Sequence, residues 1–318
     1  MNLHRIVIQL RRLAPLGIFI CCCSTVFGQQ TRPDHWTETA SFDYGISADI
    51  TYGVFNNVPV RLDVWRNLKA TGPVPTLLYV HGGGWVFGDK NGAANSFLPY
   101  IERGWNVVNV EYRMAGTSPA PAAVEDVRCA LRWVFRNTAE YHFDTNRIVA
   151  TGQSSGSHLA LMAGMLPAGT DLDSQCPAGP GEPPLKLAAI VNWFGISDVA
   201  GLLDGPDRQS YAVAWVGTQP EKMELAKHVS PLTYVRPGLP PIITVHGDHD
   251  LTVPYSQAVR LRDALTHAGV PNELVTIPNG GHGSFSDDQT QKAFERIWDF
   301  LDAHDLGAVH STASAEGH

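Results

Sequence analysis

The pattern of apolar positions along the chain predicts a sheet with two kinds of strand. Residues 48–54 and 58–66 alternate between polar and apolar side chains, which is typical of antiparallel strands with one face toward water. Six later runs are short and almost wholly apolar, as in strands that are buried on both faces of a parallel sheet. These runs are TLLYVHG at 76–82, WNVVNVEYR at 105–113, RIVATG at 147–152, LAAIVNWFG at 187–195, PIITVHGD at 241–248 and ELVTIP at 273–278.

Segments with apolar residues at helical spacing lie between several of these runs. The first begins with Pro121, and proline is common at the first position of a helix. Strands that alternate with helices predict an α/β fold with a mostly parallel central sheet, helices on both faces and antiparallel strands at the N-terminal side. The predicted helices occupy residues 121–141, 154–166, 254–269 and 289–304.

The remaining segments define the predicted domain boundaries. One α/β domain is expected over residues 29–305, and the small, polar residues 306–318 are expected to form a disordered tail. Residues 198–237 lie between two predicted strands and are too long for a plain connection, so we expect a small lid there. Trp85, Trp193 and Trp215 either line a pocket or belong to the core.

Residues 1–28 have the features of a secretory signal peptide. Three arginines precede an apolar stretch at 13–27, and small residues follow at its end. The stretch is too short to span a bilayer, and retention as an N-terminal anchor is the alternative. A lipoprotein site at Cys21 is disfavoured because no small residue precedes it. The pattern predicts that the mature chain is secreted or periplasmic.

Charge and cysteine content narrow the function classes. The 318 residues include 23 Lys and Arg against 31 Asp and Glu, a net charge of −8. No basic run is present, which argues against nucleic acid or an anionic membrane surface as partners, and no later stretch is suited to spanning a membrane. Composition leaves the oligomeric state open.

Beyond residue 28 the cysteines are Cys129 and Cys176. They either form a disulfide in an oxidising compartment or are buried as small side chains.

The segment Gly152-Gln153-Ser154-Ser155-Gly156 predicts a catalytic serine. It follows an apolar strand-like run and begins a helical one, which is the context of a sharp strand-turn-helix corner. The residues two before and two after the nucleophile must be very small at such a corner. The two glycines therefore select Ser154 as the nucleophile, and Ser155 contributes its backbone amide.

Three consecutive glycines after the strand at 76–82 predict close approach of the backbone to a ligand. Glycine lowers stability in ordered segments, so a run of three indicates a functional constraint. We expect the amides of Gly83 and Gly84, together with that of Ser155, to stabilise an oxyanion, and Gly82 is an alternative donor. His81 is expected to brace this loop rather than to act in catalysis.

The acid and base of the site are expected later in the chain. Asp250 follows the run PIITVHGD, and His282 lies between two glycines after the next predicted strand. His282 would accept the serine proton, and Asp250 would orient its ring. Asp248 is the alternative acid, although it is better suited to holding the turn. His158 is one helical turn past the serine and is expected to pack within the fold.

With these residues in place, the chain resembles the α/β-hydrolases. It is most similar to the bacterial feruloyl and acetyl esterase-like branch and more distantly to the hormone-sensitive-lipase-like esterases. The latter usually have an acidic residue before the nucleophile, where this chain has Gln153. The motifs that carry the resemblance are YVHGGGW at 79–85, GDK at 88–90, EYR at 111–113, the helix from Pro121, GQSSG at 152–156, HGDHDLTVP from His246 and GHG at 281–283.

The resemblance implies a secreted serine esterase that works through an acyl-enzyme and needs neither a metal nor an organic cofactor. Its expected partners are small-molecule or polysaccharide esters, with acetyl or feruloyl acyl groups. Two alternatives remain at this point. One is an amidase or peptidase of the same fold, and the other is an inactive hydrolase-fold protein that binds partners.

Overall fold

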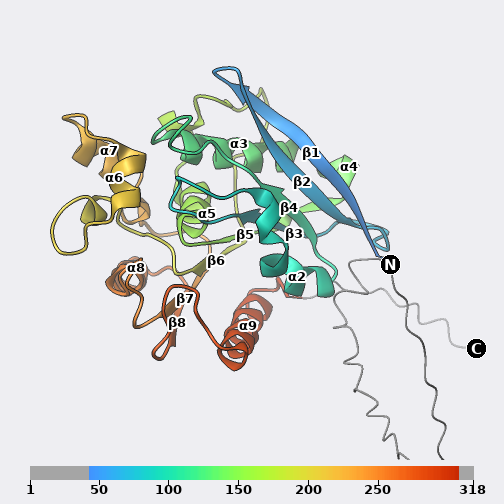
Figure 1. Ribbon diagram of the computed structural model, residues 1–318. Coiled ribbons are helices and arrows are strands. Elements are labelled where there is room, and N and C mark those ends of the chain that lie inside the picture. Colours follow the sequence, from blue (N-terminus) through green and yellow to red (C-terminus); the bar gives the residue numbers. More distant parts are fainter. Residues whose placement is uncertain (1–42, 308–318) are drawn as a thin grey trace, which may run out of the picture. The chain divides into compact units, whose positions relative to one another are not determined.

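The computed structural model describes residues 43–307 (Figure 1). Within them, eight strands form one sheet in the order β1-β2-β4-β3-β5-β6-β7-β8. The predicted signal peptide and residues 308–318 of the predicted tail lie outside the described residues. The strands are β1 (Tyr44–Phe55), β2 (Val58–Asn67), β3 (Val74–Val80), β4 (Asn106–Val110), β5 (Phe143–Gln153), β6 (Ala189–Trp193), β7 (Ile242–Gly247) and β8 (Asn272–Ile277).

Strand direction follows the hydrophobic pattern. The β1 and β2 strands pair antiparallel, β2 is antiparallel to β4, and every pairing from β4 to β8 is parallel. All residues of β3, β4, β6 and β7 are buried, whereas β1 is mostly accessible to water. The predicted α/β fold, with antiparallel strands at its start and a parallel centre, is confirmed.

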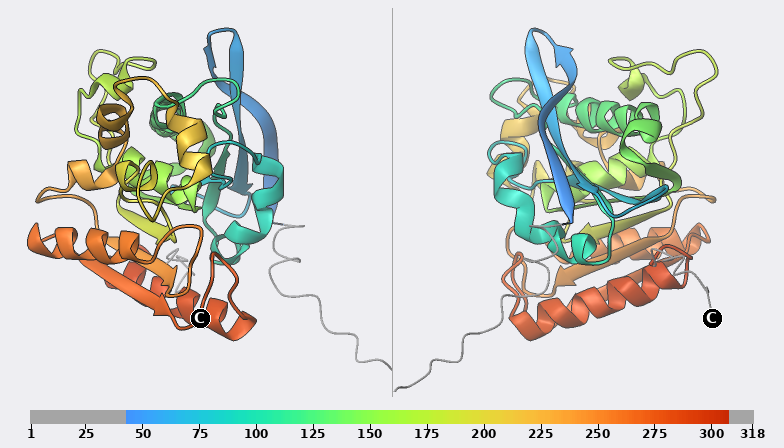
Figure 2. Two further views of the ribbon diagram at one scale, coloured as in Figure 1. Left: turned by 60° about the vertical axis from the view of Figure 1, so that its left-hand side comes forward. Right: turned by 90° about the vertical axis from the view of Figure 1, so that its right-hand side faces the viewer.

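Helices cover both faces of the sheet (Figures 1 and 2). Side chains alternate along β3, so Leu78 and Val80 pack with α3, α5 and α8, while Leu77 and Tyr79 pack with α2 and α9. This alternation divides the interior into two cores. The helices are α2 (Ala94–Glu102), α3 (Ala122–Arg136), α4 (Thr138–Tyr141), α5 (Ser155–Met165), α6 (Ser210–Val216), α7 (Lys222–His228), α8 (Ser256–His267) and α9 (Asp287–Asp302).

Two helical details differ from the sequence prediction. The helix expected over 121–141 ends at Arg136 and resumes as α4, because Asn137 donates its side-chain amide to the Trp133 carbonyl at 2.7 Å. Such local side-chain bonds compete with a continuous helix. The sequence analysis did not predict α2. This helix contains Pro99, and an interior proline normally argues against a helix.

The segment 198–237 folds between β6 and β7 as α6, α7 and two short 3-10 helices, η3 (Ala200–Leu202) and η4 (Pro231–Tyr234). Its Trp215 is fully buried and stacks on Trp85 at a ring-centroid distance of 4.1 Å. The segment is therefore anchored in the core, and its role as a lid stays a prediction. At the C-terminal end, Leu306 is buried in the core beside α9, so this first residue of the predicted tail belongs to the folded domain.

The Pro/Gly-rich connection between α5 and β6 is fastened to α3. Cys129 and Cys176 form a disulfide with a Cα–Cα distance of 5.5 Å, which decides between the two alternatives for these cysteines. Arg128 also pairs with Asp173 of η2 (Asp171–Asp173) through two bonds of 2.6 and 2.7 Å. The long connection is thus held to the body of the domain at two neighbouring points.

Candidate active site

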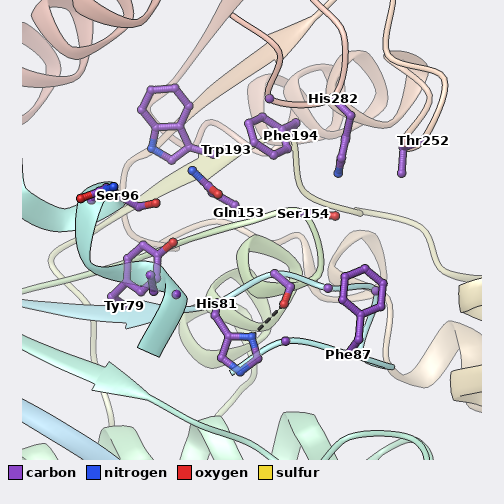
Figure 3. A pocket seen from close by; sticks show the side chains of 18 of the residues that line it. Tyr79, His81, Phe87, Ser96, Gln153, Ser154, Trp193, Phe194, Thr252 and His282 are labelled. Atoms are coloured by element: carbon purple, nitrogen blue, oxygen red, sulfur yellow. Dashed lines mark hydrogen bonds between the residues drawn. The ribbon is translucent and has the colours of Figure 1, made fainter. Parts of the chain in front are cut away.

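A cavity of about 870 Å³ opens at the carboxyl ends of the central parallel strands (Figure 3). Tyr79 and residues 81–84 line it from the end of β3, Gln153 and Ser154 from the end of β5, and Trp193 from the end of β6. His282 lines it from the loop after β8. Ligands of open α/β sheets bind at this edge, so the cavity is the candidate site.

Ser154 occupies a sharp turn between β5 and α5. Its backbone has φ 55° and ψ −121°, a strained conformation for a residue with a side chain. A Cβ atom at Gly152 would collide with the carbonyl oxygen of Val80, and one at Gly156 with the carbonyls of Val80 and His81. The two glycines are therefore required for the turn to lie against β3, and the turn directs Ser154 into the cavity.

Ser157 fastens this turn to the neighbouring strand, a role that no sequence motif indicated. Its hydroxyl donates to the Gly152 carbonyl at 2.6 Å and accepts the Trp193 amide at 2.8 Å. The Ser154 amide also donates to the Trp193 carbonyl at 3.0 Å. The position of the serine is thus fixed by backbone and side-chain bonds across β5 and β6.

Asp250 and His282 are brought together beside Ser154. Oδ2 of Asp250 accepts a hydrogen bond from Nδ1 of His282 at 2.7 Å. Oδ1 of Asp250 accepts the amides of Thr252 and Val253 at 2.8 and 2.9 Å, which fixes the carboxylate. The ring of His282 points from its loop toward Ser154 (Figure 3). The contact between His282 and Asp250 is the one that the sequence predicts between the base and the acid that orients it.

His246 is a further partner of the carboxylate that the sequence analysis did not assign. It is fully buried at the end of β7, and its Nε2 lies 3.3 Å from Oδ2 of Asp250 and 2.9 Å from the Val253 carbonyl. Burial by itself raises the pKa of Asp250, but hydrogen bonds from His246, His282 and the Val253 amide outweigh it and hold that pKa below its usual value. Asp250 is therefore an anion at neutral pH.

Asp248 lies outside the cavity lining and holds a turn. Its Oδ1 accepts the Asn279 amide at 2.7 Å and lies 2.6 Å from Nδ1 of His249. The hydrogen bond with His249 lowers the pKa of Asp248. The structure thus separates the two carboxylates that the sequence left as alternatives: Asp250 contacts His282, and Asp248 does not.

The glycine loop presents two amides of defined direction. The Gly82 carbonyl accepts a hydrogen bond from Nδ1 of His81 at 2.8 Å, and the Gly83 carbonyl accepts the amides of Val86 and Phe87, each at 3.1 Å. In a trans peptide the N–H points away from the C=O of the same unit. The amides of Gly83 and Gly84 therefore point away from these partners, and both residues line the cavity.

Ser155 is the first residue of α5, and the first amides of a helix have no acceptor within it. Its amide is thus available as the third predicted donor, beside Ser154. Gly83 and Gly84 have φ 121° and 59°, which only glycine adopts without strain.

His81 is buried and stacks on Tyr112 with a distance of 4.5 Å between the ring centroids. Burial lowers the pKa of His81. It braces the loop as an uncharged ring.

His158 is engaged away from the cavity. Its Nδ1 accepts the indole N–H of Trp85 at 3.2 Å, and its Nε2 lies 2.6 Å from the Val229 carbonyl. Burial lowers the pKa of His158 to about 4. Both ring nitrogens are occupied, so His158 is not placed to act as a base.

Of the three tryptophans singled out from the sequence, Trp85 and Trp215 are core residues and Trp193 lines the cavity.

Across residues 43–307, no group of three or more His, Cys, Asp or Glu side chains is arranged to hold a metal ion. In the same part of the chain, no helix combines the length and apolar character needed to cross a membrane.

The chain is similar to known proteins over most of its length. The BD-FAE protein-family model matches residues 62–265, more than half of the chain. The probable carboxylic ester hydrolase LipM and the esterase LipC of Mycobacterium tuberculosis are 32% and 29% identical over 70% of this chain. These stretches cover 52% and 56% of the two relatives, so the chain spans about half the length of the curated relatives it matches.

Two solved structures have the same fold. A truncated carbohydrate esterase from gut microbiota superimposes with a TM-score of 0.70 at 25% identity, over 83% of this chain and 98% of that one. Esterase 2 of Thermogutta terrifontis gives a TM-score of 0.67 at 26% identity, over 86% and 95% of the two chains.

The packing of the serine turn predicts a large cost for one added methyl group. Gly156→Ala should lower the free energy of unfolding by about 1–3 kcal/mol, because its Cβ meets two backbone carbonyls that cannot move aside. Gly92→Ala is the matched control, since nothing lies within 4 Å of its added Cβ, and it should change stability by less than about 0.5 kcal/mol. Urea unfolding measures both, and equal midpoints for the two variants would contradict the packing described here.

Proposed function

This chain belongs to the BD-FAE family of α/β-hydrolases, and on that basis we propose that it hydrolyses carboxylic esters with Ser154, His282 and Asp250 as its catalytic residues. The observation that carries the proposal is the 2.7 Å bond between Asp250 Oδ2 and Nδ1 of His282, which lines the same cavity as Ser154. A serine hydroxyl is a weak nucleophile, so it requires such an oriented base.

The proposed first half of the reaction acylates the serine. Nε2 of His282 accepts the Ser154 proton while Oγ forms a bond to the ester carbonyl carbon. The carbonyl oxygen becomes an oxyanion, and the amides of Gly83, Gly84 and Ser155 stabilise it. One such donor contributes about 3–4 kcal/mol to transition-state stabilisation. Asp250 stabilises the imidazolium and keeps its Nδ1–H in place.

Collapse of this intermediate releases the alcohol and leaves an acyl-enzyme. His282 returns its proton to the leaving alcohol oxygen, and the bond from that oxygen to the acyl carbon breaks. A water molecule then gives a proton to His282 as it attacks the acyl carbon, and the same amides hold the second oxyanion. The bond from Oγ to the acyl carbon then breaks, His282 returns its proton to Oγ, and the carboxylic acid leaves.

The proposed location is outside the cytoplasm, in the periplasm or the medium. The basic and apolar pattern of residues 1–28 supports export by a signal peptide. The disulfide between Cys129 and Cys176 is a second support, because disulfides persist in oxidising compartments.

The proposed substrates are acetyl or feruloyl esters of polysaccharides, or other short-chain esters. The similarity to a carbohydrate esterase supports a glycan-borne ester. The aromatic side chains of Tyr79, Trp193, Phe285 and Phe294 line the cavity and suit a planar acyl group. Tyr211, from the predicted lid at 198–237, contributes another wall.

The serine pair provides the first test. Ser154→Ala should lower kcat for 4-nitrophenyl acetate by roughly 10⁴-fold or more, because the nucleophile is lost. Ser155→Ala keeps its backbone amide and should retain activity within a few-fold of wild type. Steady-state rates, with circular dichroism to verify folding, measure the difference. Equal losses in the two folded variants would refute the assignment of the nucleophile.

The two carboxylates provide the second test. Asp250→Asn should lower kcat by about 10³- to 10⁴-fold, because the amide favours the wrong tautomer of His282. Asp248→Asn removes a carboxylate from the adjacent turn and should change kcat by only a few-fold. The reverse ranking would assign the acid to Asp248.

The substrate proposal requires a panel of acetylated xylan, methyl ferulate and 4-nitrophenyl esters from C2 to C12. Acid release should be fastest for acetyl or feruloyl esters and should fall for long aliphatic chains. A preference for C8 or longer chains would contradict the proposed substrate class. Hydrolysis of 4-nitroanilides at rates similar to the esters would favour an amidase.

A further inference from the structure

Trp85 has a backbone conformation that its side chain does not favour. Its φ is 61°, in the left-handed region, and it directly follows Gly83 and Gly84 of the glycine loop. A bulky residue remains in this region only when its surroundings hold it there. The contacts of the Trp85 side chain therefore determine whether the preceding peptide units keep their direction.

Two buried neighbours hold the Trp85 indole. It stacks on Trp215 of α6, with centroids 4.1 Å apart and planes 14° from parallel. Its Nε1–H donates to Nδ1 of His158 at 3.2 Å. Because Nε2 of His158 lies 2.6 Å from the Val229 carbonyl, which only accepts, the ring must carry its proton on Nε2. Nδ1 is then free to accept, and both bonds are satisfied by one neutral tautomer.

His158 also belongs to the helix that begins at the nucleophile. Its amide donates to the Ser154 carbonyl at 3.0 Å, and it lies one turn into α5. The predicted oxyanion donors come from two elements: Gly83 and Gly84 from the loop after β3, and Ser155 from α5. The bond between Trp85 and His158 joins these two elements within the core.

We propose that His158 is a positioning residue, which aligns the amides of Gly83 and Gly84 with that of Ser155 by holding the Trp85 indole. The inference rests on the proposed ester hydrolysis and adds a buried residue that does not touch the substrate. An oxyanion forms only during the reaction, so misaligned donors weaken the transition state more than the bound ester. Loss of the bond should therefore lower kcat and leave KM nearly unchanged.

Four variants separate the hydrogen bond from packing. His158→Phe keeps a ring but removes the acceptor, and Trp85→Phe removes the donor. Each should lower kcat for 4-nitrophenyl acetate by about 10- to 100-fold, less than the 10²–10³ that loss of a whole donor costs. His158→Asn places Oδ1 where Nδ1 was and should recover most of the loss. Trp215→Phe is the packing control, because its indole N–H has no hydrogen-bond partner, and kcat should change by only a few-fold.

A thionoester makes the test specific for the oxyanion hole. Sulfur accepts hydrogen bonds more weakly than oxygen, so a C=S ester depends less on the aligned amides. The deficit of His158→Phe relative to wild type should shrink on O-4-nitrophenyl thionoacetate. A structural defect that disturbs the whole site would lower both rates in parallel, and that result would overturn the proposal.

The indole resonance provides a readout without catalysis. In protein labelled with ¹⁵N-Trp, the Trp85 Nε1–H signal should move upfield in His158→Phe and return toward its wild-type position in His158→Asn. An unchanged signal in His158→Phe, or wild-type kcat in that variant, would refute the proposal. A wild-type protein that hydrolyses no ester would refute the proposed function instead, and the indole signal would still decide whether the bond exists.

Discussion

The close approach of the serine turn to the end of β3 is the contact on which the site depends. Gly152 and Gly156 allow the turn to lie directly against the carbonyls of Val80 and His81. That approach places Ser154 beside the glycine loop, which begins at Gly82. A side chain at either glycine would separate the two backbones and move Ser154 away from the loop. The rest of the fold serves to hold these two segments at that distance.

His81 and His282 line the cavity, whereas His158 and His246 are buried outside its lining. Hydrogen-bond partners give each of the four a different task. His81 supports the glycine loop, His158 supports Trp85, and His246 contacts the carboxylate of Asp250. All three are buried, and each has at least one ring nitrogen that contacts a fixed group of the protein. The His282 side chain retains 23% of its exposure and directs its free edge toward the cavity. Accessibility, rather than residue type, therefore distinguishes the proposed base.

Much of this arrangement is predictable from sequence because it depends on local signals. Buried parallel strands leave apolar runs, and close backbone contacts require glycine, so the sheet and the serine turn were both evident. Long-range partners leave no such signal. The contact of His246 with Asp250 requires the loop after β7 to fold back, and the Ser157 bonds cross to a strand that begins at Ala189. The cysteine pairing was undecided for the same reason, since 47 residues separate Cys129 from Cys176.

The inserted segment at 198–237 has a consequence for how such a domain can be diversified. Its Tyr211 packs against Gly84 and donates its hydroxyl to the Thr252 carbonyl at 2.9 Å, while its Trp215 supports the back of Trp85. A loop exchange that replaced this segment to alter the entrance would also remove the contacts that support Gly84 and Trp85. If the proposed function holds, specificity and catalytic power are therefore coupled in this chain, and a graft must carry aromatic residues equivalent to both.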